Sequence, residues 1–324
     1  MIDWSKTALV FPGQNSQVVG MGADLATRFA EAAAVYHEAD TLMGWPISRL
    51  CWEGPAEQLD ETSNTQPALY VTCVATLRAL ESAVAPVVGG RLRPACAAGH
   101  SLGEITALVA AGSLSFADGL TLVRERGRLM QAAGTANPGG MAAILGAEVD
   151  LVEQMCAQAA AETGAPVVIA NDNCPGQLVI AGAPGALERA IALLKEAGVR
   201  RVRPLAVSVA GHSPLLADAA ASLRDVLEDI DFQPPAMPVI ANTSVMPLAD
   251  AAAIRAELAA QLTSRVRWTE SVRAMRAAGV EVFIEVGPKD VLTALLRRID
   301  EGATGIALNS AEALDALIAA GAQG

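Results

Sequence analysis

The sequence is poor in the residues that cross-link proteins or bind metals. Its 324 residues include five cysteines and three histidines, and only 3% are aromatic. The cysteines are odd in number, scattered and without a C-x-x-C pair, which argues against a disulfide framework or a zinc site and indicates a reducing compartment. Three histidines also argue against a histidine-based metal site. With so few aromatic side chains, the core must be built from Ala, Val, Leu and Ile.

Targeting signals and excess positive charge are also missing. Residues 1–6 show neither the basic start nor the apolar run of a signal peptide. No uninterrupted apolar stretch reaches the length needed to span a bilayer. We therefore expect a cytoplasmic protein without a membrane partner. The formal net charge of −12 disfavours nucleic acid as a partner.

The strongest local signal lies at residues 95–112. Small apolar residues lead into Gly99-His100-Ser101-Leu102-Gly103, a G-x-S-x-G pattern, and apolar residues at helical spacing follow. This order predicts a strand, a sharp turn and a helix, with Ser101 at the apex beside free backbone N–H groups. The alternative is a glycine-rich turn that carries an incidental serine.

The remaining strand and helix signals predict an α/β fold. Residues from about 139 to 207 read β-α-β-β-α-β, which is the ferredoxin-like order. We predict an α/β-hydrolase-like core with a parallel sheet, formed by residues 1–134 and 208–324, and an inserted ferredoxin-like subdomain at 135–207. Core strands are expected at 7–11, 95–99, 238–242, 282–286 and 305–308. Helices are expected at 23–42, 66–83, 116–133, 150–163, 184–197, 254–262, 265–278 and 291–299.

Two further residues stand out by their position. Arg126 shares an apolar stripe of its predicted helix with Leu122 and Met130. A guanidinium there needs an anionic partner, which is a carboxylate of either the protein or a substrate. His212 directly precedes a serine and a proline that suit a helix start, and the positive end of that helix favours a neutral imidazole. A hydrogen-bonded structural histidine is the alternative reading.

Together these segments resemble the malonyl-CoA:acyl-carrier-protein transacylases of fatty acid synthesis and the related acyltransferase domains of polyketide synthases. The resemblance spans nearly the whole chain. The matching segments are Phe11-Pro12-Gly13-Gln14, residues 99–103, Arg126-Gly127, residues 171–176, Gly211-His212, Gln261-Leu262 ahead of Val266-Arg267-Trp268, and Glu285-Val286-Gly287-Pro288.

The resemblance implies a catalytic role for five of these residues. Ser101 would carry the acyl group as an ester, and His212 would be its general base. The backbone carbonyl of Gln261 would orient His212, in the place where a hydrolase triad has an aspartate. The backbone N–H groups of Gln14 and Leu102 would form the oxyanion hole.

The resemblance also implies substrate contacts. Arg126 would hold the free carboxylate of a malonyl group, and Asn173 and His100 would line the site. No cofactor and no metal are implied, because malonyl-CoA and the phosphopantetheine of the carrier protein are both substrates. The sequence departs from the family at Asn15, where glycine is usual. Asparagine tolerates left-handed backbone, so we expect the loop to keep its shape.

The implied activity is ping-pong transfer of malonyl from malonyl-CoA to an acyl carrier protein, by a monomer, for fatty acid synthesis. Open alternatives are an acyltransferase acting in trans on a polyketide synthase or in malonate decarboxylation, a serine thioesterase or other hydrolase, and a non-catalytic relative. Carrier proteins of this family are acidic, so docking on this acidic chain needs a local basic patch. The candidates are Arg200, Arg201 and Arg203, or Lys289 with Arg297 and Arg298.

Overall fold

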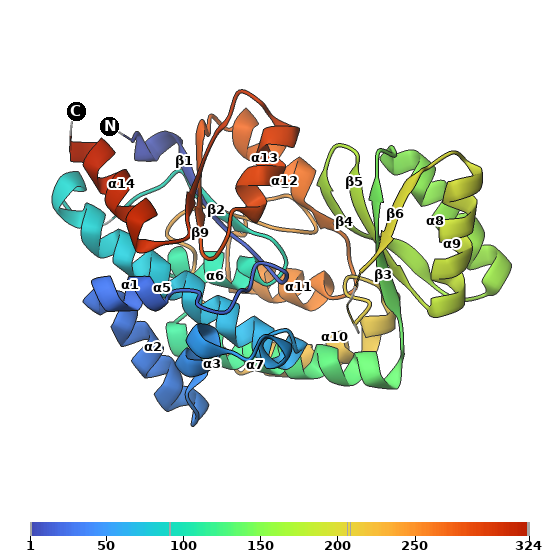
Figure 1. Cartoon of the computed structure of the whole chain (residues 1–324), viewed down its shortest axis with the longest axis horizontal. Coiled ribbons are helices and arrows are strands. Elements are labelled where there is room, and N and C mark those ends of the chain that lie inside the picture. The colour runs from blue at the N-terminus through green and yellow to red at the C-terminus, as the bar shows by residue number, and fades with distance from the viewer. Residues whose placement is uncertain (1, 91, 206, 208, 323–324) are drawn as a thin grey trace.

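The computed structural model describes residues 2–90, 92–205, 207 and 209–322. Within them, the strands form two five-stranded sheets, one in the order β10-β9-β1-β2-β7 and the other in the order β6-β3-β5-β4-β8. Figure 1 shows the second sheet with its two helices at one end of the molecule, and the two chain termini together at the other.

The first sheet is parallel throughout, as predicted for the core. Its strands alternate between two apolar layers: Ala8 and Val10 face one hydrophobic cluster, and Leu9 and Phe11 face another. Burial on both faces explains why these strands read as continuous apolar runs. The strands are β1 (Thr7–Phe11), β2 (Cys96–Gly99), β7 (Val239–Ile240), β9 (Val282–Val286) and β10 (Thr304–Leu308).

Helices cover this sheet. The predicted helix over 23–42 is two helices, because Phe29 has an extended backbone that separates them. Ser115 caps α7 by accepting a hydrogen bond from the Asp118 N–H. The helices are α1 (Ala23–Arg28), α2 (Ala30–Met43), α3 (Ile47–Glu53), α4 (Ala56–Leu59), α5 (Thr62–Val88), α6 (Gly103–Ala110), α7 (Phe116–Ala136), α10 (Ala217–Glu228), α11 (Ala251–Gln261), α12 (Trp268–Ala277), α13 (Val291–Ile299) and α14 (Ala311–Ala322).

One core helix passes the length and composition test for a membrane span. The qualifying segment of α5 is Thr62–Pro86, which contains Arg78 and Glu81 and is therefore not an uninterrupted apolar stretch. Moreover, 72% of the tested window is buried inside the protein. The helix packs against α2 and α7, and its apolar character is explained by this central position.

The second sheet has the predicted ferredoxin-like order. Its first four strands pair antiparallel as β6-β3-β5-β4, which matches a β-α-β-β-α-β unit. The predicted pattern runs to about residue 207, but its last strand ends at Pro204, and residue 206 lies outside the described residues. The elements are β3 (Gly140–Leu145), α8 (Val149–Thr163), β4 (Val167–Cys174), β5 (Gln177–Gly182), α9 (Pro184–Glu196) and β6 (Arg201–Pro204).

The fifth strand of this sheet comes from a distant part of the chain. β8 (Val266–Arg267) pairs in parallel with Asn171 and Asp172 of β4. The predicted helix over 265–278 was therefore wrong at its start, because residues 266–267 bond to a neighbouring strand and α12 begins only at Trp268. The domain boundaries given above remain a prediction.

Candidate active site

Ser101 lies in the sharp turn between β2 and α6. Its φ of +53° is in the left-handed region, which costs energy for a residue other than glycine. A β-carbon on Gly99 would lie 1.9 Å from the carbonyl carbon of Gly103, and one on Gly103 would lie 2.0 Å from the Phe11 oxygen. Neither position has room for a side chain. The predicted strand, sharp turn and helix around Ser101 are confirmed. The lack of room for a β-carbon explains why both flanking positions are glycine.

His212 joins this serine to a backbone carbonyl. The Ser101 Oγ lies 2.8 Å from Nε2 of His212. Nδ1 of His212 lies 2.8 Å from the carbonyl oxygen of Gln261 and 3.2 Å from that of Ser264. Because carbonyls only accept hydrogen bonds, Nδ1 carries the proton and Nε2 is free to accept one from the serine. This is the tautomer that a general base requires.

The same histidine is held in its neutral form. His212 is buried, and this burial, followed by the nearby charge of Arg126, lowers its pKa to about 3. The sequence predicted a neutral ring from the helix that follows. Ser213 does cap there, but the first element is a three-residue 3-10 turn, Pro214–Leu216, ahead of α10. Burial, rather than the helix end, is the main cause of the low pKa.

Arg126 lies on α7 and contacts the serine. Its Nη2 donates to Ser101 Oγ at 3.0 Å and to Gln261 Oε1 at 2.8 Å, and its Nη1 donates to Gln66 Oε1 at 2.8 Å. The side chain is buried, and burial lowers its pKa to about 10, so it stays charged at neutral pH. It forms no salt bridge with any residue that the structure describes. The sequence analysis gave a protein carboxylate and a substrate carboxylate as possible partners of Arg126. The protein carboxylate is not found among the described residues.

Asn242 supports the serine turn, and the sequence did not single it out. Its Oδ1 accepts from the Ser101 N–H at 2.7 Å, and its Nδ2 donates to the Gly99 oxygen at 2.7 Å. The Asn242 N–H and Nδ2 also donate to Glu104 at 2.8 and 3.1 Å. Burial raises the pKa of this glutamic acid well above its usual value. Its position in the sequence could have identified it, because Asn242 follows a strand that neighbours β2.

The predicted oxyanion donors lie beside the serine. Gln14 and Leu102 line the same cavity as Ser101. Neither backbone N–H donates to another group within the described part of the chain. Asn15 has a φ of +79°, so asparagine adopts the left-handed backbone for which glycine is usual in the family.

His100 and Asn173 form a pair at the wall of the site. Nε2 of His100 lies 2.9 Å from Oδ1 of Asn173, and the His100 ring meets Trp268 edge-on. His100 lines the cavity, whereas the neighbouring residue that reaches it from β4 is Asn171 rather than Asn173. The cavity is lined by Gln14, Asn15, His100, Ser101, Leu102, Arg126, Met130, Met141, Asn171, Val207, Val209, Gly211 and His212.

The two sheets therefore share this cavity. Met141 of β3 and Asn171 of β4 come from the second sheet and line the cavity together with Ser101. No group of three or more His, Cys, Asp or Glu that could hold a metal ion occurs among residues 2–90, 92–205, 207 and 209–322. All five cysteines are buried and free.

Fold and site together define a serine-dependent acyl-transfer enzyme. A family model described as the acyl transferase domain matches residues 8–311, and the chain belongs to this family. It is 44% identical over 312 residues to a malonyl CoA-acyl carrier protein transacylase of Haemophilus influenzae, covering 96% of this chain and 98% of that protein.

Solved structures agree with this assignment. A crystal structure of an acyl carrier protein S-malonyltransferase from Vibrio cholerae is 46% identical with a TM-score of 0.91, covering 96% of this chain and 99% of that one. A second structure holds a type II polyketide acyl-carrier protein in complex with its malonyl-transacylase. The matching chain is 42% identical with a TM-score of 0.91, covering 97% of this chain and 99% of that one.

Proposed function

We propose that this protein transfers malonyl from malonyl-CoA to the thiol of an acyl carrier protein and so supplies extender units for fatty acid synthesis. The observation that carries the proposal is the Arg126 guanidinium, a buried cation 3.0 Å from the Ser101 hydroxyl and without a carboxylate partner among the described residues. A plain hydrolase has no use for such a cation. The family assignment and the relatives named above support the same activity.

The first half of the reaction forms an ester on Ser101. His212 Nε2 takes the hydroxyl proton as Oγ attacks the thioester carbonyl carbon. The backbone N–H groups of Gln14 and Leu102 stabilise the negative oxygen of the tetrahedral intermediate, and losing one such donor typically costs about 100- to 1,000-fold in rate. The intermediate then collapses, the C–S bond breaks, and the CoA thiolate takes the proton from His212.

The second half reverses these steps with a different thiol. The carrier-protein thiol gives its proton to His212 and attacks the ester, and Ser101 leaves with that proton. Arg126 holds the malonyl carboxylate through two N–H groups in both halves. Met141 and Asn171 line the cavity from the second sheet and limit the access of water to the ester. His100, braced by Asn173, shapes the facing wall.

The chemistry calls for no metal and no cofactor, because side chains supply the nucleophile, the base and the cation. We further propose that the protein works as a monomer in the cytoplasm, without a membrane partner. The composition of the chain and its family resemblance support these proposals.

The carrier protein would dock on exposed cations near the cavity. The Lys289 Nζ donates to the backbone oxygen of Asn15 at 3.2 Å, and Asn15 lines the cavity. Arg298 donates to the Pro175 oxygen at 3.0 Å, across from the core to the second sheet. We therefore favour Lys289, Arg297 and Arg298, which form no salt bridge with any described residue.

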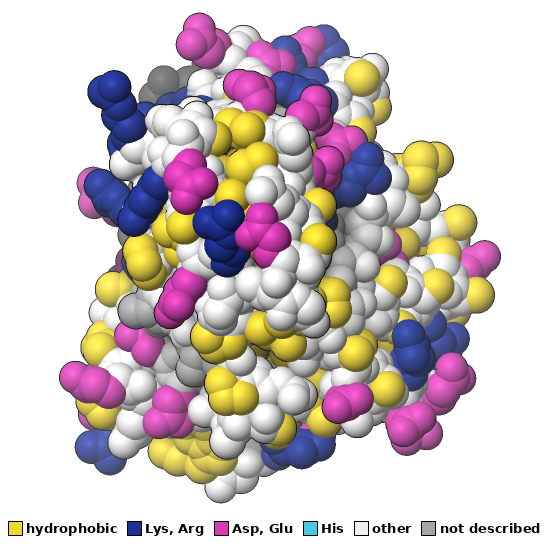
Figure 2. Space-filling model, turned by 90° about the vertical axis from the view of Figure 1, so that its right-hand side faces the viewer, with side chains coloured by type: hydrophobic (Ala, Val, Ile, Leu, Met, Phe, Trp, Pro, Cys, Tyr) yellow, Lys and Arg dark blue, Asp and Glu magenta, His cyan; other side chains and the backbone are white. Residues whose placement is uncertain are grey.

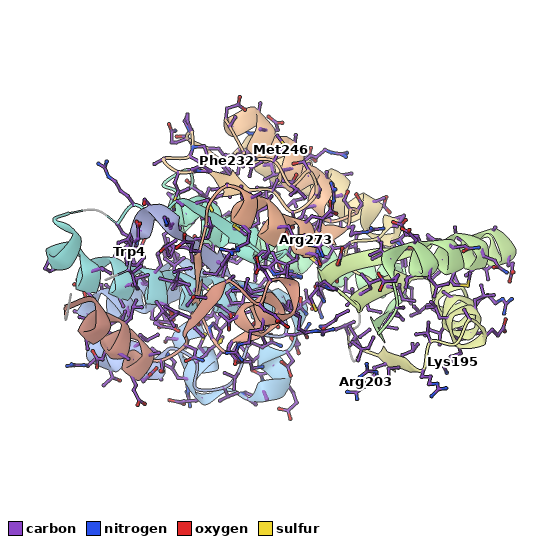
Figure 3. The ribbon with its side chains drawn as sticks, turned by 90° about the horizontal axis from the view of Figure 1, so that it is seen from above. Trp4, Lys195, Arg203, Phe232, Met246 and Arg273 are labelled. Atoms are coloured by element: carbon purple, nitrogen blue, oxygen red, sulfur yellow. The ribbon has the colours of Figure 1, made fainter. Side chains whose placement is uncertain are left out.

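The other basic cluster lies at β6, on the second sheet. Figure 3 shows Arg203 and Lys195 at the outer edge of the second sheet's domain, pointing away from the rest of the molecule. Figure 2, which views this end of the protein, shows acidic and basic side chains mixed over its surface rather than a continuous basic patch. Arg200, Arg201 and Arg203 are thus the weaker candidates.

A competition experiment tests the proposed function. The protein is mixed with malonyl-, methylmalonyl- and acetyl-CoA, with and without carrier protein, and adducts on Ser101 are followed by intact mass. We expect a malonyl adduct that is stable alone, disappears when carrier protein is added, and is absent in Ser101→Ala. Rapid loss to water regardless of carrier would instead show a hydrolase, and the absence of any adduct would show a non-catalytic relative.

A further inference from the structure

The buried cation at the active site is surrounded by neutral acceptors. Gln66 Oε1 and Gln261 Oε1 each lie 2.8 Å from the Arg126 guanidinium, on Nη1 and Nη2 respectively. Both glutamines are buried, with 1% and 0% of their surface exposed. A buried guanidinium is ordinarily paired with a carboxylate, because desolvating an unpaired charge is costly. Here two amides take the place of that carboxylate.

The two amides hold the guanidinium from different elements. Gln66 comes from α5, in the first turns of that helix, and its Nε2 lies 3.1 Å from the Met130 sulfur. Gln261 is the last residue of α11. The arginine on α7 is therefore held between two helices that are distant in sequence, which fixes its direction toward Ser101.

The orientation of the Gln261 amide is determined by its neighbours. Its Nε2 donates to Glu104 Oε2 and, at 3.1 Å, to the Ser101 backbone oxygen. Its Oε1 must then face Arg126, since the guanidinium only donates and the carboxyl and carbonyl oxygens accept. Glu104 is thus separated from Arg126 by one amide. The Glu104 carboxyl orients the Gln261 amide without forming a hydrogen bond or salt bridge with Arg126.

We propose that Gln66 and Gln261 are positioning and specificity-determining residues that hold Arg126 in place with neutral acceptors and so leave its charge available to the acyl group's carboxylate. A glutamate at either position would fit the same space and would form an ion pair with Arg126. Such a pair would compete with the incoming carboxylate for the guanidinium. The inference rests on the proposed function, because it explains how that site selects a carboxylated acyl group.

Gln66→Glu is the direct test, because the Gln66 side chain forms no hydrogen bond with Ser101 or His212 and the change adds only a charge. Gln66→Leu is the matched control, which removes the acceptor without adding a charge. The readout is the rate constant for loading Ser101 from malonyl-CoA divided by that from acetyl-CoA, measured by rapid quench and intact mass. A general loss of structure would lower both rates and leave this ratio unchanged.

We expect Gln66→Glu to lower the ratio by about 10- to 100-fold, the range for losing a hydrogen bond to a charged group. Gln66→Leu should lower it less. A folded Gln66→Glu protein whose ratio stays within about threefold of the unsubstituted protein would overturn the inference. If Gln66→Glu does not fold, Gln66→Leu decides: a lowered ratio supports the inference and an unchanged ratio overturns it.

The two proposals fail in distinguishable ways. If the unsubstituted protein forms no malonyl ester on Ser101, the proposed function itself is wrong. If it loads malonyl in preference to acetyl and Gln66→Glu does the same, only the role of the amides is wrong.

Discussion

The Ser101 hydroxyl lies 2.8 Å from the His212 ring, although the two residues are 111 positions apart in the sequence. The whole second sheet except β8 lies between the two in sequence. The chain therefore leaves the core after α7, forms the second sheet, which contributes residues to the cavity lining, and returns to place the base against the nucleophile. Substitutions in this arrangement should therefore have measurable effects on activity and on stability.

Removing the cation should change which acyl group is accepted. We expect Arg126→Ala to lower malonyl loading of Ser101 by about 100-fold, the upper range for a hydrogen bond to a charged group, and acetyl loading far less. Arg124→Ala is the matched control, because Arg124 is exposed on the same helix. Loading rates from malonyl- and acetyl-CoA check this. Equal losses on both substrates would contradict the role of Arg126 in binding the carboxylate.

The low pKa of His212 should be visible in the pH dependence of the reaction. Burial and the charge of Arg126 lower this pKa from 6.5 to about 3, so the base stays neutral across the physiological range. We expect kcat/KM for malonyl loading to be nearly flat from about pH 8 to pH 5. An acid limb with its midpoint between about pH 6 and 7, the range of an ordinary histidine, would show that His212 is not shifted.

The lowered pKa of His212 should also make the free energy of unfolding depend on pH. Between pH 6.5 and about 3, the unfolded chain binds a proton on His212 that the folded protein does not. Stability is therefore lost as the pH falls through this window and is unaffected by this residue above it. Urea unfolding at pH 7 and pH 5 should show a smaller loss for His212→Gln than for the unsubstituted protein. An identical loss in both would count against the shift.

Asn242 should affect kcat, because it holds the turn that carries Ser101. Its removal leaves the Ser101 N–H and the Gly99 carbonyl without their partner. We expect Asn242→Ala to cost about 1–3 kcal/mol in the free energy of unfolding and on the order of 100-fold in kcat, because small displacements of a nucleophile are costly. Asn137→Ala, at an exposed helix end, is the control. Wild-type kcat in Asn242→Ala would exclude a positioning role.

The glycines of the turn should not tolerate a side chain. A β-carbon at Gly103 would lie 2.0 Å from the Phe11 oxygen, and backbone cannot easily move aside. We expect Gly103→Ala to lose about 3 kcal/mol or more of the free energy of unfolding. Gly185→Ala, with open space around it on α9, should instead gain up to about 1 kcal/mol. Urea denaturation of both variants measures the difference, and similar stabilities would refute it.

Charge reversal should separate the two basic clusters. Changing Lys289, Arg297 and Arg298 together to glutamate should raise KM for the carrier protein about 10-fold, since exposed ion pairs contribute up to about 1 kcal/mol each. The KM for malonyl-CoA and kcat should change little. The same change at residues 200, 201 and 203 is the comparison. An unchanged carrier KM in both variants would end the idea of docking at either cluster.

Much of the fold could be predicted because its signals are local. The parallel strands are continuous apolar runs, and the β-α-β-β-α-β order of the second sheet is legible from turns and periodicity. β8 could not be predicted in this way. Val266 and Arg267 are too few to show a period, and their strand exists only because β4 offers an unpaired edge. The same holds for the full length of α5, which was predicted over 66–83 but begins at Thr62 and continues past Pro86 under the packing of neighbouring helices.

The sequence by itself determined the serine turn, because the glycines flanking Ser101 follow from short-range sterics. It also determined that Arg126 is buried, because helical periodicity places it on an apolar stripe. The tertiary structure alone decided what surrounds that cation. Gln66, Gln261 and Ser101 come from three separate elements, and only packing shows that the acceptors are neutral amides. It also decided the state of His212, since burial depends on the whole fold and not on neighbours in sequence.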